Sequence, residues 1–513
     1  MLKDNNLKDF KSEANTTNSL SSKKSLSIFR LTKFYMLLLF LIISRLSFGQ
    51  DTSSKIDKKD LKSFIKTLTS PQFGGRGIDN DGQIKTQEFI ANRFKELQLE
   101  PFSSDGYLEK ISLHQISRGE IFLKTQNNRR LQNFDHMIFL GGIQQNGEIE
   151  RKVVYGGYGT EEELNQIDVD SCFVLIFLTN SRDEIAINNR LKERNANGII
   201  FFLNNDENYE SMKRRLKEYH LRKKYSIVGY SDTVELSPKL KEILNAMPII
   251  NSITVPESEV NNIIGLSKNK LISLADRGKI DEAPQSVIKL NFEQVEKTVE
   301  TANVIGIIKG KSDKSIIISA HYDHLGEGEN LYYPGADDNA SGIAALIELA
   351  EELAQNGNLN YTMIFLATTA EESGLLGSKY YVEQPDFDPE KVICNVDIDM
   401  ISRCDDKHTD CKYLYCIGNN KFEMLDSLVR EADKHFPNYI FDYSENDSDI
   451  FARSDGASFM KKGIPTLMFF SGFHDDYHKP SDTMDKIDFT ILENRIKLIL
   501  EVIKLLQEKE IPI

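Results

Sequence analysis

Five residues in the C-terminal half of the chain have side chains that bind divalent metals: His321, Asp338, Glu372, Asp399 and His478. Mixed imidazole and carboxylate donors suit metals of intermediate softness, zinc above all, whereas a site lined only by oxygen suits magnesium or calcium. Two zinc ions about 3.5–4 Å apart need one bridging carboxylate, and each ion also needs one carboxylate and one neutral imidazole. These five residues provide that number and kind of ligands.

Each of these residues also has a purely structural explanation. A single histidine after a strand is ordinarily a polar loop residue, and an aspartate before a helix, such as Asp338, is ordinarily an N-cap. Glu371 and Glu372 could be acids that a helix dipole favours in a first turn. These explanations would have to place all five residues at one sheet edge by chance, so we favour the metal site.

The chain after Asn303 alternates between short apolar runs and longer amphipathic stretches. The short runs predict buried strands, and the spacing of Ile343, Leu346 and Ile347 predicts one apolar helix face. Alternating strands and helices specify a mainly parallel sheet flanked by helices, so we expect the α/β class. The expected strands are residues 315–320, 361–366, 392–398 and 465–470, and the expected helices include residues 341–355 and 488–509.

The metal-type side chains follow these strands in order. His321 comes directly after the first strand and Glu372 follows the second. Asp399 and His478 follow the third and the last, and Asp338 precedes the first helix. Ligands of open α/β sheets bind beyond the carboxyl ends of the strands, so the five side chains should converge there.

The length of 513 residues requires more than one hydrophobic core. Residues 106–295 change to short β-rich runs mixed with helical stretches and carry few histidines or acids that could converge. We expect this part to be a separate mixed α/β domain without catalytic residues. The expected parts are a signal peptide or anchor (1–50), the N-terminal helical part of the catalytic domain (51–105), the inserted domain (106–295) and the catalytic domain (296–513).

The first fifty residues have the order of an export signal. A lysine-rich start is followed by the apolar run 34–43 and then by small residues near Gly49. The run is shorter than a membrane-spanning helix needs and is closely followed by Arg45, so we expect cleavage near Gly49 and a secreted or periplasmic protein. An uncleaved anchor, which would give membrane contact, and a translation start at Met36 remain alternatives. The run is not followed by a cysteine that could carry a lipid.

The formal net charge of −15 argues against a nucleic-acid partner, because phosphate binding needs clustered lysine and arginine. The five cysteines contain no metal-type CxxC pair, and an odd number cannot all pair within the chain. A disulfide among Cys404, Cys411 and Cys416 is one option that the sequence leaves open.

Five segments resemble the metal motifs of family M28 peptidases in order, spacing and flanking residues. The N-terminal stretch 58–101 is similar to the family's helical segment, and the inserted part resembles the protease-associated (PA) domain of many members. The chain departs from many relatives at Ser454-Asp455-Gly456, where they have Ser-Asp-His, and this puts details of the specificity pocket in doubt. The five motifs are SAHYDHLG (319–326), GADDNASG (335–342), AEESGLLGS (370–378), DMISR (399–403) and YHKPSDT (477–483).

The resemblance implies a role for each matching residue. His321 and Asp399 would bind one zinc ion, Glu372 and His478 the other, and Asp338 would bridge the two through a loop whose Asp338–Asn339 peptide is cis. Glu371 would be the general base, and Tyr477 would donate to the oxyanion unless it is only a packed aromatic. Asp323 would accept the second N–H of His321, behind the ligands. Further ligands, namely His324, His474, Asp475 and Asp476, are rejected because each lies beside a better match.

We therefore expect a two-zinc hydrolase that removes N-terminal residues from peptides or proteins. The aminopeptidase is favoured because residues 399–403 resemble that side of the family and the catalytic half has no distinctive arginine cluster for a terminal carboxylate. A carboxypeptidase with the same metals is the main alternative. A single-zinc glutaminyl cyclase and a metal-free, receptor-like relative are others, which the intact ligand set argues against.

Overall fold

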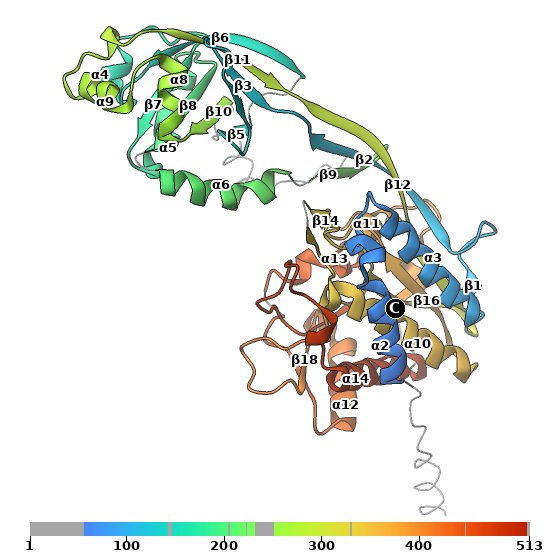
Figure 1. Ribbon diagram of the computed structural model, residues 1–513. Helices are drawn as coiled ribbons and strands as arrows, with labels where there is room; N and C mark the ends of the chain where they lie inside the picture. Colours follow the sequence, from blue (N-terminus) through green and yellow to red (C-terminus); the bar gives the residue numbers. More distant parts are fainter. Residues whose placement is uncertain are drawn as a thin grey trace, which may run out of the picture. The chain divides into compact units, whose positions relative to one another are not determined.

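The computed structural model describes residues 56–141, 146–203, 206–221, 223–230, 251–328, 331–446 and 448–509 (Figure 1). The expected export signal at residues 1–50 lies outside these residues. None of the helices formed by the described residues combines the length and the apolar character needed to cross a bilayer.

A ten-stranded sheet organises the part of the chain that carries the five expected ligands. Its order is β19-β18-β20-β17-β13-β16-β12-β2-β9, and β1 also pairs with β12. The four central strands β20, β17, β13 and β16 are parallel, as expected, whereas β18 on one side and β12 and β2 on the other run antiparallel to their inner neighbours. The strands are β1 (Glu100–Pro101), β2 (Leu108–Arg118), β9 (Lys224–Ile227), β12 (Gln294–Ile308), β13 (Ser312–His321), β16 (Tyr361–Thr368), β17 (Val392–Ile398), β18 (Tyr413–Ile417), β19 (Ile440–Asp442) and β20 (Thr466–Phe470).

Helices cover both faces of this sheet because alternate strand residues point to opposite sides. Ile316 and Ile318 pack into the large core with α2, α3, α10, α12 and α14, whereas Ile317 packs on the other face with Val382 of α11 and Phe459 of α13. Figure 1 shows α2, α10 and α14 close together, although they come from distant parts of the sequence. The helices are α2 (Lys58–Leu68), α3 (Asp81–Glu96), α10 (Gly342–Asn356), α11 (Leu376–Val382), α12 (Glu423–His435), α13 (Gly456–Lys461) and α14 (Phe489–Glu508).

A second sheet of eight strands has its own hydrophobic core. Strands β6, β7, β8 and β10 are parallel, and β7 is completely buried. This part is mixed α/β, as expected, but β2 and β9, which fall inside the residues assigned to the insertion, pair in the larger sheet. The strands are β3 (Phe122–Thr125), β4 (Arg130–Gln132), β5 (Ile138–Gly141), β6 (Gly147–Tyr155), β7 (Phe173–Leu178), β8 (Gly198–Leu203), β10 (Asn251–Val255) and β11 (Ser286–Phe292), and the helices are α4 (Glu161–Leu164), α5 (Glu184–Glu193), α6 (Asp206–Leu221), α8 (Val260–Ile264) and α9 (Lys268–Asp276).

The cysteines divide into one pair and three single thiols. Cys404 and Cys411 form a disulfide in the loop between β17 and β18. Cys172, Cys394 and Cys416 are free and buried.

Candidate metal centre

The five expected ligands come together at the carboxyl edge of the central strands. His321 is the last residue of β13, and Asp399 directly follows β17. Glu372 lies in the turn after β16, and His478 lies in the loop after β20. Asp338 lies in the helical turn Ala336–Ser341, directly before α10, and its peptide bond to Asn339 is cis, as expected.

Asp338 stands between two pairs of donors. His321 Nε2 lies 3.5 Å from Asp338 Oδ1 and 3.2 Å from Asp399 Oδ1. On the other side, His478 Nε2 lies 3.2 Å from Asp338 Oδ2 and 3.1 Å from Glu372 Oε2. Each pair therefore contains one imidazole and one carboxylate, and each faces a different oxygen of Asp338.

This geometry fits a pair of metal ions. Two ligand atoms bound to one tetrahedral zinc at 2.0–2.1 Å lie about 3.3 Å apart, close to the separations within each group. Asp338 is only 3% exposed, and its buried Oδ2 faces the imidazoles of His478 at 3.2 Å and His324 at 3.7 Å. The carboxylates of Asp338, Glu372 and Asp399 lie close together in this partly buried cluster, which is costly without compensating positive charge, so the donor set fits bound cations.

The protonation of the imidazoles reflects the surrounding carboxylates. Burial opposes the charged form of His478, but hydrogen bonds to Asp338 and Glu372 raise its pKa to about 9. Burial likewise opposes the charged form of His321, and the charges of Glu371, Asp399 and Asp338 raise its pKa well above the ordinary value. The two imidazoles must lose these protons when they bind metal.

Glu371 and Glu372 diverge because the chain turns sharply between β16 and α11. Ala370 has a φ of 56°, a left-handed conformation that is uncommon for residues other than glycine. The carboxylate of Asp323 fixes the turn by accepting the backbone N–H groups of Glu371 at 3.1 Å and Glu372 at 3.4 Å. Burial and the nearby acids raise the pKa of Glu371 well above its usual range, although His321 opposes this shift.

Asp323 touches His321 mainly through its backbone. Its carbonyl oxygen lies 3.2 Å from His321 Nδ1, whereas its carboxylate oxygen is 4.0 Å away. The carbonyl is therefore the acceptor for the second ring nitrogen, and the carboxylate instead holds the turn of Glu371.

His324 belongs to the site, although the sequence motif favoured its neighbours. Its Nδ1 lies 2.8 Å from Glu372 Oε1 and 3.7 Å from Asp338 Oδ2, and the side chain is fully buried. Glu372 thus lies between the imidazoles of His324 and His478. Either imidazole could complete a group with Asp338 and Glu372, a choice that the sequence cannot make because it depends on side-chain direction.

Two further buried groups support the loop of Asp338. Arg76 is fully buried and donates to the backbone carbonyls of Tyr322, Leu68, Pro334, Gly335 and Asp338. Asp337 accepts from the backbone and hydroxyl of Ser402 and faces His474 Nε2 at 3.2 Å. In the sequence, the signals of these contacts were the turn-like stretch GGRG at residues 74–77 and His474, which lies four residues before His478.

A pocket of about 490 Å³ opens on the metal centre. One wall is apolar and includes Met400, Met468, Phe470 and Phe473, and Glu371 and Tyr477 also line it. The Tyr477 ring stacks on His478 with 3.8 Å between centroids, and its hydroxyl accepts from Arg453 at 3.2 Å. Burial and the charges of Asp338, Glu372 and Asp399 raise the pKa of Tyr477, so the phenol stays protonated.

The sheet and the paired donor groups at its carboxyl edge define an α/β metal-binding protein. Residues 303–503 match the model of Peptidase family M28.

Named relatives match part of the chain. A probable lipoprotein aminopeptidase, LpqL, of Mycobacterium tuberculosis is 29% identical over 38% of this chain and 43% of its own length. A probable leucine aminopeptidase of Arthroderma otae is 27% identical over 40% of this chain and 58% of its own length. The chain therefore spans about half the length of the curated relatives it matches.

The fold extends over more of the chain than these sequence matches do. The zinc aminopeptidase BSAP from Bacillus subtilis superposes with a TM-score of 0.52, covering 89% of this chain and 97% of that structure, at 17% identity. At this identity the likeness shows a shared fold.

Proposed function

We propose that this protein is a two-zinc aminopeptidase that hydrolyses the N-terminal peptide bond of peptides or proteins. The main observation behind this proposal is the position of Asp338. One of its carboxylate oxygens lies beside the pair His321 and Asp399, and the other lies beside the pair His478 and Glu372. His321 and Asp399 would hold one zinc ion, Glu372 and His478 the other, and Asp338 would bridge them. The matched family and the aminopeptidase names of the relatives support this assignment.

Glu371 is the proposed general base. The bound zinc ions would polarise the scissile carbonyl and lower the pKa of water. Glu371 faces the same pocket and would take the proton of the attacking water and deliver it to the leaving amine. Its raised pKa supports this role, because it makes the carboxylate a stronger base.

Tyr477 and Asp323 assist in different ways. The Tyr477 hydroxyl lines the pocket and, while protonated, can donate to the oxyanion of the tetrahedral state. Asp323 is proposed to set the positions of His321, through its carbonyl, and of Glu371, through its carboxylate.

The pocket supports a preference for apolar N-terminal residues. Met468, Phe470 and Phe473 offer a wall on which a leucine or phenylalanine side chain can be buried. Several relatives are named leucine aminopeptidases, which agrees with such a wall.

A carboxypeptidase is the second candidate, because Arg453, Lys379 and Lys461 also line the pocket. A terminal carboxylate needs such a cation. Arg453 already donates to Tyr477 and lies 5.5 Å from the Phe473 ring centroid, so its position is explained without a substrate. A single-zinc glutaminyl cyclase or an inactive relative is less consistent with five converging donors.

We propose that the protein acts outside the cytoplasm. The disulfide Cys404–Cys411 supports an oxidising compartment, in agreement with the export signal expected at residues 1–50. We retain the division into the parts 51–105, 106–295 and 296–513 and the PA-like nature of the inserted part as proposals. The proposed partners are peptides, and the acidic net charge speaks against nucleic acid.

The test is a panel of aminoacyl-anilides assayed before chelation, after chelation and after zinc add-back. We expect activity on leucine and phenylalanine anilides, loss on chelation and recovery at two zinc ions per chain. The matched control is the same substrate with an acetylated N-terminus, which should not be hydrolysed. Equal hydrolysis of the acetylated substrate, or full activity with one ion, would contradict the proposal.

A further inference from the structure

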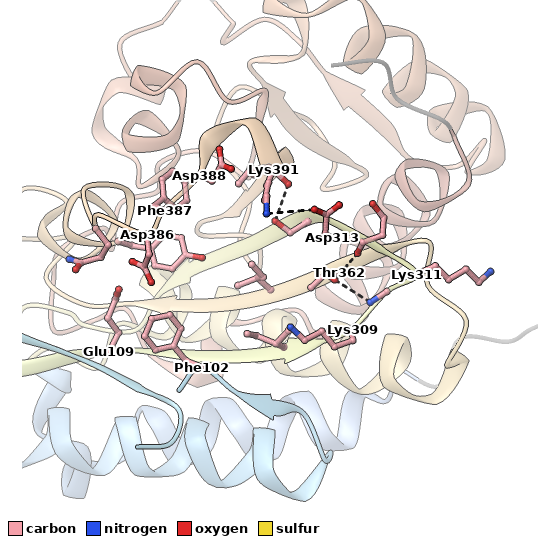
Figure 2. Close-up of a pocket in the computed structure, with 18 residues that line it drawn as sticks. Phe102, Glu109, Lys309, Lys311, Asp313, Thr362, Asp386, Phe387, Asp388 and Lys391 are labelled. Carbon is pink, nitrogen blue, oxygen red and sulfur yellow. Dashed lines mark hydrogen bonds and ion pairs between the residues drawn. The ribbon is translucent and has the colours of Figure 1, made fainter. Parts of the chain in front are cut away.

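A second pocket, of about 520 Å³, is shown in Figure 2. It is lined by Ser315 of β13, Thr362 and Ile364 of β16, and Val392 of β17, which lie near the starts of these strands. Ser315 and His321 are six residues apart on β13, which corresponds to about 20 Å. The pocket is therefore separate from the proposed catalytic centre.

A buried carboxyl group forms one end of this pocket. Glu109 of β2 is only 6% exposed, and its Oε2 accepts from Asn303 Nδ2 at 2.7 Å. Its Oε1 is buried and has no hydrogen-bond partner among the described residues. An unsatisfied buried oxygen of this kind is unfavourable and is expected to receive a donor from a ligand or from water.

Asn303 cannot turn to satisfy this oxygen. Its Nδ2 also donates to the carbonyl of Gly377 at 2.9 Å, and its Oδ1 accepts from Thr369 N at 3.1 Å. All three contacts hold the amide in one orientation. Glu109 Oε1 is thus left for a group that enters the pocket.

A second acid lies beside Glu109. Figure 2 shows Asp386 and Glu109 at the same end of the pocket. Burial, and in the same direction the charge of Asp386, raise the pKa of Glu109 to about 7, although the hydrogen bond from Asn303 opposes the shift. The two acids also contribute to the raised pKa of Tyr381, whose main cause is burial. This end of the pocket therefore favours a positive charge.

The rest of the lining combines apolar side chains with lysines and other polar side chains. Phe102, Ile307, Ile364 and Phe387 provide a surface for a hydrocarbon group. Of the three lysines in the lining, Lys391 lies 3.6 Å from Asp313 Oδ2 and Lys309 lies 4.0 Å from Glu100 Oε2, whereas Lys311 donates to Asn360 Oδ1 at 3.3 Å. Since Lys391 and Lys309 have acidic neighbours, an anionic ligand would have to compete with these acids for the two lysines.

We propose that this pocket binds a small primary amine with an apolar body, with the ammonium group at Glu109 and Asp386 and the hydrocarbon against Phe102, Ile364 and Phe387. The ammonium group donates to the unsatisfied Glu109 Oε1 and offsets the charge of two neighbouring acids. A neutral ligand of the same shape satisfies only the first requirement.

The experiment is calorimetric titration of the zinc-loaded full chain with 3-methylbutylamine and, in parallel, with the neutral isostere 3-methylbutan-1-ol. We expect the amine to bind, and the alcohol to bind at least about tenfold more weakly because it lacks the charge. Equal binding of the alcohol, or no binding of the amine at millimolar concentration, would overturn the proposal.

Two variants test whether the amine binds in this pocket. Glu109→Gln keeps the shape but removes the charge, and Ile364→Trp fills the pocket without changing Glu109. Both should weaken amine binding at least about tenfold, since each removes one of the two interactions.

The matched control is Glu348→Gln. Glu348 is 3% exposed and also has a buried Oε1 without a hydrogen-bond partner among the described residues, but it does not line the pocket. Unchanged binding in this control is expected, whereas a loss equal to that of Glu109→Gln, or parental affinity in both pocket variants, would overturn the proposal. Peptidase activity is not the readout, so failure here is distinct from failure of the proposed function.

Discussion

At the scale of single residues, Asp338 determines whether the two donor pairs form one centre. It is the only member of the expected ligand set with an oxygen within 3.5 Å of each of the imidazoles of His321 and His478. Its neighbour Asp337 points instead toward Ser402 and His474. The two adjacent acids therefore have different roles: Asp338 faces the proposed metal ligands, and Asp337 contacts the residues that support its loop.

Replacing Glu371 with glutamine should lower kcat by about 10²–10⁴-fold, because an amide cannot take the proton of the attacking water. The zinc content, measured by atomic emission, should stay at two ions per chain, since Glu371 is not a proposed ligand. Peptide hydrolysis at the parental rate would show that another group is the base.

His324 and His478 should differ in their effect on metal content. We expect His478→Ala to lose one of the two zinc ions during dialysis against a weak chelator. His324→Ala should keep both ions but bind the weaker one about 10–100-fold less tightly, because His324 would orient Glu372 from behind. The reverse result would make His324 the ligand and His478 the orienting residue.

At the scale of elements, the short helical segment Pro71–Arg76 holds the loop of Asp338 in place. Arg76 at its end joins the carbonyl of Tyr322, directly after β13, to those of Gly335 and Asp338 before α10. Burial lowers the pKa of Arg76 to about 10, although the nearby carboxylates oppose the shift, so the guanidinium stays charged at neutral pH.

Arg76→Met should therefore lower the free energy of unfolding by about 3 kcal/mol or more, because several buried carbonyls lose their donor. Urea unfolding of the metal-free protein measures this loss. Lys85→Met is the control, since Lys85 is exposed and donates only to the carbonyl of Gln72. Similar effects of the two substitutions would argue against a special role for Arg76.

The packing of α10 against the start of α2 should make stability depend on pH. Burial and the nearby acids Glu351, Asp60 and Asp57 raise the pKa of Glu348 in α10 from 4.5 to about 8, although a backbone hydrogen bond from Asp57 opposes this shift. Between these pH values the unfolded chain has lost this proton and the folded chain keeps it, so rising pH favours unfolding.

Glu348→Gln should remove this dependence. We expect parent and variant to differ least in Tm near pH 4.5 and the variant to become progressively more stable than the parent up to about pH 8. Thermal unfolding across this range measures the difference. A constant difference in Tm would mean that Glu348 ionises normally in the folded protein.

At the scale of the whole molecule, zinc binding and stability should be linked. Asp338, Glu372 and Asp399 gather with Glu371 in one partly buried cluster, and bound zinc ions would offset their mutual repulsion more strongly than the imidazoles of His321 and His478 do. Chelation should lower Tm, and zinc should restore it.

Asp399→Asn should change the sign of this effect. The metal-free variant should be more stable than the metal-free parent, because one of the repelling charges is gone. Zinc should stabilise the variant less than the parent, because a ligand is gone. Calorimetric scans of both proteins with and without zinc test the two signs, and a variant that is less stable than the parent in both states would contradict them.

The sequence by itself determined the α/β class. It also determined which metal-binding residue type follows each central strand, and therefore that the candidate centre lies at the carboxyl ends of those strands. The expected strand 392–398 and helix 488–509 correspond to β17 and α14 almost residue for residue. These features were accessible because apolar periodicity and residue order are local properties of the chain.

Only the tertiary structure decided how side chains from distant segments meet. It placed His324 next to Glu372 and Arg76 in hydrogen-bond contact with the carbonyl of Asp338. It also placed β2 and β9 in the larger sheet and paired Cys404 with Cys411. It also left Glu109 facing a pocket with an unsatisfied oxygen. These outcomes depend on strand pairing and side-chain direction over long sequence separations, and local patterns do not encode them.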